Sequence, residues 1–91
     1  MNIKLTKEAE RDYKKIIKNG QKSSLKRVIQ IFEELEVSPR EGIGQPERLK
    51  HFKDKEVWSR KIDKMNRIVY LIKDDELIVL VISMLGHYDD K

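Results

Sequence analysis

The sequence contains no cysteine, only two prolines, and no hydrophobic run of membrane-spanning length. The absence of cysteine excludes a disulfide scaffold, a thiolate zinc site and a cysteine nucleophile. A membrane span needs about 18 consecutive apolar residues, whereas the longest run here, Leu77 to Ile82, has the length of a strand. The N-terminal residues also lack the apolar region of a secretion signal. We therefore expect a cytoplasmic protein without membrane contacts.

Ninety-one residues suffice for one small domain, which we expect to span 1–91. Histidine is scarce as well: His51 and His87 are too few for a histidine-rich metal site. We expect no metal ion and no cofactor.

Charge is abundant but unevenly distributed. Residues 1–70 carry 18 basic and 11 acidic side chains, whereas residues 71–91 carry 2 and 5. A basic surface attracts polyanions, and nucleic acid is the most common of them. A solvated lysine-rich surface would have the same composition, so charge alone leaves both interpretations open.

Hydrophobic spacing predicts an α+β fold in the order β-α-α-β-β-β. The short N-terminal strand and a helical hairpin are expected to pack on a twisted, largely antiparallel sheet. In the first strand of the C-terminal half, alternation places Ser59 and Lys61 on one face and Trp58 and Arg60 on the other. The expected elements are a strand at 3–5, a helix from the N-cap Thr6 to Asn19-Gly20, a helix from Ser23 or Ser24 to Ser38-Pro39, a loop at 38–50, and strands at 57–63, 67–72 and 77–82.

A few side chains stand out from this pattern as candidates for chemistry. Each has an ordinary explanation as well: a solvated glutamate, an arginine at a sheet edge, an incidental C-terminal histidine. Trp58 and Tyr70 are more typical of a core than of a base-stacking surface. The candidates are Glu47 in the Gly/Pro loop, Arg67 at the start of a strand, His87-Tyr88 after the last strand, and the nearby cations Lys50, Arg60 and Lys61.

Together these groups could cleave RNA by internal attack. That reaction needs a base for the 2′-hydroxyl proton, cations for the phosphate charge and an acid for the leaving 5′-oxygen. A carboxylate, arginine with lysines, and an imidazole can fill these roles without a metal ion. The sequence alone does not show that the groups converge in space.

Four motifs in fixed order make the chain resemble the YoeB/Txe toxins of the RelE/ParE superfamily, which belongs to bacterial toxin–antitoxin systems. The resemblance covers nearly the whole chain and implies the RelE-like fold. The motifs are Gly42-x-Gly44-x-Pro46-Glu47-x-Leu49-Lys50-His51, Trp58-Ser59-Arg60-Lys61-Ile62, Asn66-Arg67-Ile68-Val69-Tyr70 and His87-Tyr88.

The resemblance implies a ribosome-dependent endoribonuclease that cleaves mRNA in the A site. It matches Glu47 to the general base, Arg67 to the arginine that stabilises the transition state, and His87 to the general acid. It also implies a YefM-type antitoxin as partner, operator DNA bound through the antitoxin complex, and a possible homodimer. The residues matched to substrate binding are Lys50, Arg60, Lys61 and Tyr88.

Three departures from the family pattern accompany the resemblance. Lys61 stands where many relatives have arginine, and Asn66 stands where many have histidine, so Asn66 receives no role. The stretch leading to His87 is about two residues longer than in relatives. Two other classes of function stay open: a ParE-like toxin that is not a nuclease, and a module that binds nucleic acid or protein without turnover.

Overall fold

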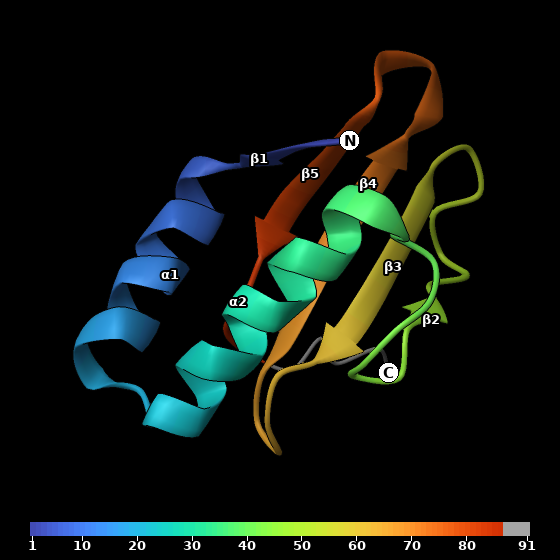
Figure 1. Cartoon of the computed structure of the whole chain (residues 1–91). Coiled ribbons are helices and arrows are strands. Elements are labelled where there is room, and N and C mark those ends of the chain that lie inside the picture. The colour runs from blue at the N-terminus through green and yellow to red at the C-terminus, as the bar shows by residue number, and fades with distance from the viewer. Residues whose placement is uncertain (87–91) are drawn as a thin grey trace.

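The computed structural model describes residues 1–86, in which a helical hairpin covers one face of a five-stranded sheet (Figure 1). The strand order is β1-β5-β4-β3-β2; β1 runs parallel to β5, and every other pairing is antiparallel. The predicted α+β fold is confirmed. The elements are β1 (Asn2–Leu5), α1 (Lys7–Asn19), α2 (Lys22–Val37), β2 (Glu47–Arg48), β3 (Glu56–Lys61), β4 (Arg67–Lys73), a short 3-10 turn (Asp74–Glu76) and β5 (Ile78–Ser83).

The two helices begin for different local reasons. The Thr6 hydroxyl accepts a hydrogen bond from the Ala9 amide at 3.1 Å, which confirms Thr6 as the N-cap of α1. Helix α2 begins at Lys22, slightly before the predicted serines, because the backbone carbonyl of Gln21 already accepts from the amides of Ser24 and Leu25. Only two residues therefore separate the helices.

One strand was not expected from the sequence. The predicted loop 38–50 contains β2, which pairs Glu47 with Ser59 and Arg48 with Trp58 of β3. Two residues are too few to show a period-2 pattern. The bounds of the other strands lie within two residues of those predicted, which is the usual precision at element ends.

The sheet is covered differently on its two faces. The main core lies between the helices and the sheet, and it includes the fully buried Val28, Ile31 and Tyr70. A smaller cluster lies on the opposite, helix-free face, where the strands contribute Val57, Val69 and Leu71. Side chains of the segment after β2 pack against this second cluster. They leave the neighbouring part of the same face, around Ser59 and Arg67, to form a site.

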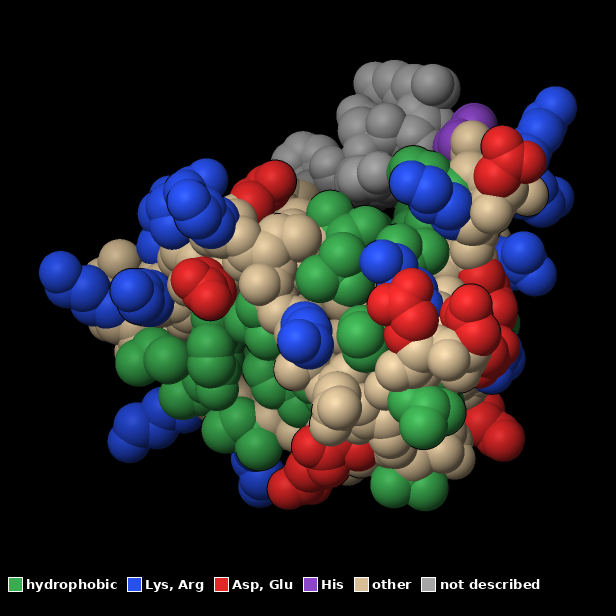
Figure 2. All heavy atoms as spheres, turned by 90° about the horizontal axis from the view of Figure 1, so that it is seen from above, with side chains coloured by type: hydrophobic (Ala, Val, Ile, Leu, Met, Phe, Trp, Pro, Cys, Tyr) green, Lys and Arg blue, Asp and Glu red, His purple; other side chains and the backbone are tan. Residues whose placement is uncertain are grey.

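The surface of the molecule is strongly charged. Basic side chains project in groups from its margins, and hydrophobic side chains are visible between them (Figure 2). Neither helix within residues 1–86 has the length and apolar character needed to cross a membrane.

Candidate active site on the helix-free face of the sheet

The register of three strands brings Glu47 and Arg67 together. Glu47 of β2 lies opposite Ser59 of β3, and Arg67 is the first residue of β4. The Arg67 guanidinium Nη1 lies 3.8 Å from the Glu47 carboxylate Oε1 and donates a hydrogen bond to the Ser59 hydroxyl at 3.4 Å. The side chain of Glu47 is 66% exposed and that of Arg67 is 32% exposed, so both can be reached by a ligand.

A second cation lies directly across from Arg67. Lys61 of β3 is the register partner of Arg67 in β4, and alternation along both strands places the two side chains on the helix-free face. Like charges directly opposite each other in a sheet are destabilising. Two adjacent cations beside a single carboxylate therefore make a site suited to an anion such as a phosphate.

The other predicted residues fall in different places. Lys50 is exposed in the turn that follows β2, three positions after Glu47. His87 and Tyr88, the predicted general acid and a predicted substrate contact, lie outside the described residues. Glu47, Arg67 and Lys61 are thus the predicted residues that the sheet itself brings to one place.

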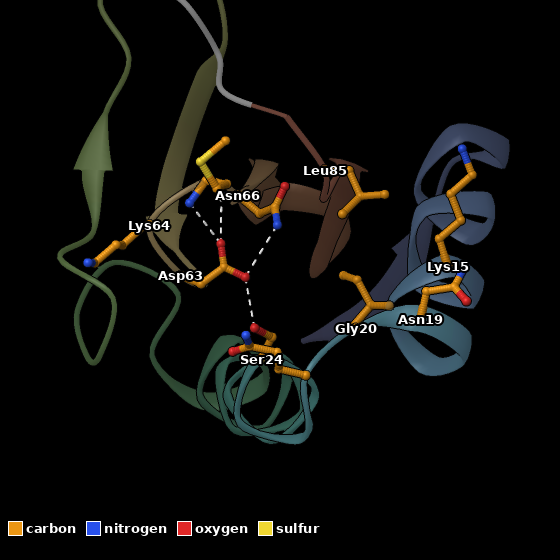
Figure 3. A pocket seen from close by; sticks show the side chains of 11 residues that line it. Lys15, Asn19, Gly20, Ser24, Asp63, Lys64, Asn66 and Leu85 are labelled. Carbon is orange, nitrogen blue, oxygen red and sulfur yellow. Dashed lines mark hydrogen bonds between the residues drawn. The ribbon is translucent and has the colours of Figure 1, made fainter.

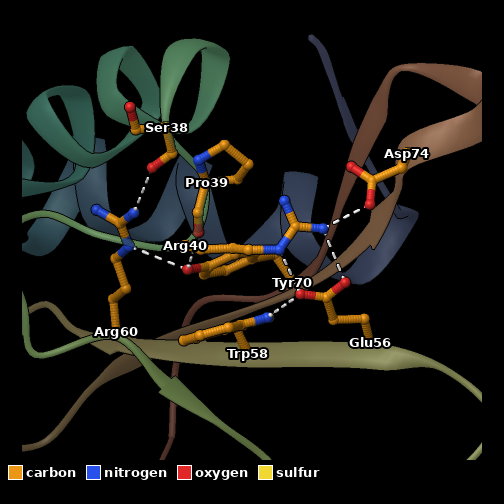
Figure 4. Close-up of polar contacts among 8 residues, drawn as sticks. All are labelled: Ser38, Pro39, Arg40, Glu56, Trp58, Arg60, Tyr70 and Asp74. Atoms are coloured by element: carbon orange, nitrogen blue, oxygen red, sulfur yellow. Dashed lines mark hydrogen bonds and ion pairs between the residues drawn. The ribbon is translucent and has the colours of Figure 1, made fainter.

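Arg60 has a structural environment that differs from the predicted role in substrate binding. Its side chain is fully buried on the helix side of the sheet, and its Nη1 forms an ion pair with Glu34 at 2.6 Å. Its Nε donates to the Tyr70 hydroxyl at 3.0 Å, and the guanidinium also donates to the backbone carbonyls of Ser38, Glu41 and Ile43. Figure 4 shows this guanidinium beneath the end of α2. We therefore correct the sequence-based prediction and leave Arg60 out of the substrate-binding set.

The buried Arg60 explains the glycines of the motif that carries Glu47. Gly42 and Gly44 have positive φ angles of 134° and 83°, a conformation that favours glycine. A Cβ on Gly42 would lie 1.9 Å from the Glu34 carboxylate, and one on Gly44 would lie 2.8 Å from the Lys61 carbonyl. The loop can therefore approach the Arg60–Glu34 pair closely, and this approach delivers Glu47 to its place opposite Ser59.

This packing predicts the effect of Gly44→Ala. The Gly44 carbonyl also accepts a hydrogen bond from the Lys61 amide at 2.7 Å, so a displaced loop would lose contact with β3. We expect Gly44→Ala to lower the free energy of unfolding by about 1–3 kcal/mol, from backbone strain and a close backbone contact. Urea unfolding measures this loss. Gly86→Ala, where a Cβ would meet nothing within 4 Å, is the control and is expected to cost less.

Sequence reasoning missed two features, one within the site and one outside it. Ser59 is fully buried and accepts the hydrogen bond from Arg67; strand alternation was the signal, because it placed Ser59 beside Lys61. The second feature is a segment at the turn of the helical hairpin: residues 13–32 contain six basic and no acidic side chains. All six are exposed: Lys14, Lys15, Lys18, Lys22, Lys26 and Arg27.

Known proteins share both the sequence and the fold. A family profile described as the YoeB-like toxin of bacterial type II toxin-antitoxin systems matches residues 5–88. The YoeB toxin of Synechocystis is 38% identical over 88 residues, which cover 97% of this chain and 98% of that protein.

Two solved structures have the same architecture. A YoeB/ParE toxin from Agrobacterium tumefaciens superposes with a TM-score of 0.84 at 26% identity, over 97% of this chain and all of that one. The YoeB dimer from Staphylococcus aureus gives a TM-score of 0.82 at 30% identity, over 97% and 98% of the two chains. The Staphylococcus aureus protein has also been solved as a YoeB–YefM complex, with a TM-score of 0.77 at the same identity and coverage.

The family profile and these relatives, together with the helical hairpin on a mixed sheet, place the chain among the toxins of RelE-like fold from type II toxin–antitoxin systems. Within that class, the chain belongs to the YoeB family.

Proposed function

We propose that this toxin is a ribosome-dependent endoribonuclease that cleaves mRNA by attack of a 2′-hydroxyl on the adjacent phosphate. The observation that carries this proposal is the pairing of an exposed carboxylate with a guanidinium 3.8 Å away, next to a second cation in strand register. Attack of a 2′-hydroxyl on the adjacent phosphate requires a base that lies close to groups that bind the phosphate.

The proposed reaction contains two proton transfers, one to Glu47 and one from His87. Glu47 takes the 2′-hydroxyl proton as the oxygen attacks phosphorus. Arg67 offers a planar fork to the phosphate oxygens, and Lys50 adds positive charge as the negative charge of the phosphorane grows. The bond from phosphorus to the 5′-oxygen breaks, and His87 protonates that oxygen. The products are a 2′,3′-cyclic phosphate and a free 5′-hydroxyl.

The remaining assignments concern substrate contacts. Lys61 lies opposite Arg67 and would hold a neighbouring phosphate as a point charge. Tyr88 follows His87 and is proposed to hold the substrate. These organic side chains supply base, charge and acid, so the proposed reaction needs no metal ion or cofactor.

We infer that the ribosome is recognised partly through the basic residues at the turn of the hairpin. Six exposed cations within residues 13–32 present positive charge with no acidic side chain in the same segment. In α2 this arrangement works against the helix dipole, because basic residues lie near its N-terminus and the acidic ones near its C-terminus. A charge pattern that opposes the dipole is better explained by a polyanionic partner than by helix stability.

Charge reversal tests this inference. We expect the triple variant Lys14→Glu, Lys18→Glu and Lys22→Glu to weaken co-sedimentation with ribosomes by at least about 10-fold at 100 mM salt, with a shallower salt dependence. Lys53→Glu, Lys55→Glu and Lys73→Glu, which lie elsewhere, form the control set. Equal affinity of both variants would contradict the assignment.

We also propose protein partners from the relatives. The Staphylococcus aureus relative has been solved with YefM and as a dimer. By analogy, this toxin is held inactive by a YefM-type antitoxin, and the complex binds operator DNA. Homodimer formation is proposed on the same ground.

The deciding experiment is primer extension on a defined mRNA, with and without ribosomes, followed by analysis of the fragment ends. We expect cleavage only with ribosomes, and cyclic phosphate with 5′-hydroxyl ends. Fragments with 5′-phosphates would contradict the chemistry. Intact mRNA with a folded toxin would contradict nuclease activity and favour a toxin with another target.

A further inference from the structure

The backbone that leads to the C-terminal residues is held by side chains from two distant elements. Asp12 of α1 is buried, and its Oδ2 accepts hydrogen bonds from the amides of Met84 at 2.9 Å and Leu85 at 3.2 Å. The Oδ1 of Asn66, just before β4, accepts from the amide of Gly86 at 3.0 Å. Three consecutive amides are thus bound by two side chains, which we call the terminal clamp.

The carboxylate of Asp12 has no ion-pair partner among residues 1–86. Burying a charged group is costly unless hydrogen bonds compensate, and here the backbone amides of Met84 and Leu85 supply them. This buried carboxylate is thus satisfied by amides more than seventy residues away in sequence, and it holds the path of their backbone.

The orientation of Asn66 is also fixed. Its Nδ2 donates to Asp63 Oδ2 at 3.3 Å, which turns its Oδ1 toward Gly86. Asp63 is in turn held by the Ser24 hydroxyl of α2, 2.8 Å away. Figure 3 shows this chain of side chains along one wall of a groove of about 770 Å³, with Leu85 on another wall.

The carboxylate of Asp63 remains a hydrogen-bond acceptor at neutral pH. Partial burial raises its pKa, but hydrogen bonds from Ser24, the Met65 amide and Asn66 outweigh burial and bring the pKa below its usual value. The orientation of Asn66 therefore persists at neutral pH.

The clamp ends one residue before the proposed general acid. Gly86 has a φ of 92°, the left-handed region that favours glycine, so the backbone leaves the clamp in a specific turn. His87 is the next residue. The position from which the chain continues is therefore defined by Asp12, Asn66 and Gly86 together.

We propose that Asp12 and Asn66 are positioning residues that fix the start of the segment carrying His87, and so determine the rate of protonation of the leaving oxygen. This inference rests on the proposed nuclease function and adds residues to its machinery. Neither residue needs to touch the substrate; both act through the backbone of residues 84–86.

The clamp itself can be tested without any activity measurement. Asn66→Ala removes the acceptor for Gly86, and Asp12→Ala removes Oδ2, the single oxygen that accepts from both Met84 and Leu85. We expect hydrogen exchange at Gly86 in the first variant, and at both Met84 and Leu85 in the second, to accelerate at least about 10-fold. Asn19→Ala, which lines the same groove and has no side-chain hydrogen bond within residues 1–86, is the control. Unchanged exchange would overturn the clamp.

The functional part is tested by a double-mutant cycle with His87→Ala, in single-turnover cleavage of ribosome-bound mRNA. Asn66→Ala is expected to slow cleavage about 10- to 100-fold in the wild-type background, because small displacements of a reacting group have effects of this size. The ribosome concentration at half-maximal rate should stay unchanged. In the His87→Ala background the same substitution should have an effect below about 2-fold, because residues that act through one another are not additive.

Failure of the positioning role and failure of the proposed nuclease function give different results. An equal loss in both backgrounds would overturn the positioning role, as would a change in half-saturation with no change in rate. If wild-type toxin does not cleave at all, the proposed function fails, whereas the exchange rates still decide whether the clamp exists. Asn66→Ala changes a half-exposed residue, so it keeps the cycle usable if Asp12→Ala does not fold.

Discussion

Replacing Glu47 by glutamine is expected to slow ribosome-dependent cleavage by about 100- to 10,000-fold, the usual contribution of a general base. Glutamine has nearly the same shape but cannot take the 2′-hydroxyl proton. The side chain is 66% exposed and its contact with Arg67 spans 3.8 Å. An exposed ion pair of this kind contributes at most about 1 kcal/mol, so the free energy of unfolding should hardly change.

Single-turnover cleavage and urea unfolding of the same preparations separate these two effects. Glu33→Gln, an exposed glutamate on α2, makes the same change of charge away from the site and should cleave as the wild type does. Full activity of Glu47→Gln would remove Glu47 from the mechanism. A parallel loss in Glu33→Gln would instead show that the effect follows the change in net charge and not the loss of a base.

Replacing Arg60 by methionine is expected to lower the free energy of unfolding by about 3–5 kcal/mol, as breaking a buried ion pair does. The substitution would leave the Glu34 carboxylate without its cation and the Tyr70 hydroxyl without its donor, and it would remove the donor to the Ser38 carbonyl at the C-cap of α2. For a domain whose total stability is roughly 5–15 kcal/mol, this loss is severe. Urea unfolding followed by Trp58 fluorescence measures it.

Arg40 offers a matched control for the loss of a guanidinium. It also pairs with acidic groups, Glu56 at 2.7 Å and Asp74 at 2.6 Å (Figure 4), but its side chain is 42% exposed. Water can replace these contacts, so Arg40→Met should cost about 1 kcal/mol or less. Comparable losses at the two positions would contradict the structural role of Arg60. In a toxicity assay, Arg60→Met would resemble an active-site mutant only because less folded toxin accumulates.

The fold could be predicted from the sequence where particular residues mark the end of a helix or the course of a strand. The site could be predicted only in part. Thr6 and the Asn19-Gly20 pair delimit α1, and the continuous apolar run of β4 is visible from Ile68 to Ile72. Alternation also placed Arg60 on the face shared with Trp58, but it could not show that helices cover this face. Because a guanidinium often binds phosphate, the sequence suggested a substrate contact for Arg60, whereas in the structure Arg60 forms an ion pair with Glu34.

Local sequence patterns could not predict contacts between segments that are distant in the sequence. Asp12 looks like one more charged residue in a charged helix, and its partners are backbone amides 72 and 73 positions away. The strand β2 has two residues, and its existence depends on β3 as a template. A single sequence carries no signal for either.

The packing of Gly42 and Gly44 against Arg60 limits how this toxin can be switched off. The loop that presents Glu47 is fastened to the same guanidinium that ties α2 to the sheet. An inhibitor that displaced the backbone of residues 41–44 would disturb the hydrogen bonds of this loop with the buried Arg60. We therefore expect reversible control to act by covering the exposed side chain of Glu47, the proposed base, and to leave the backbone that carries it in place.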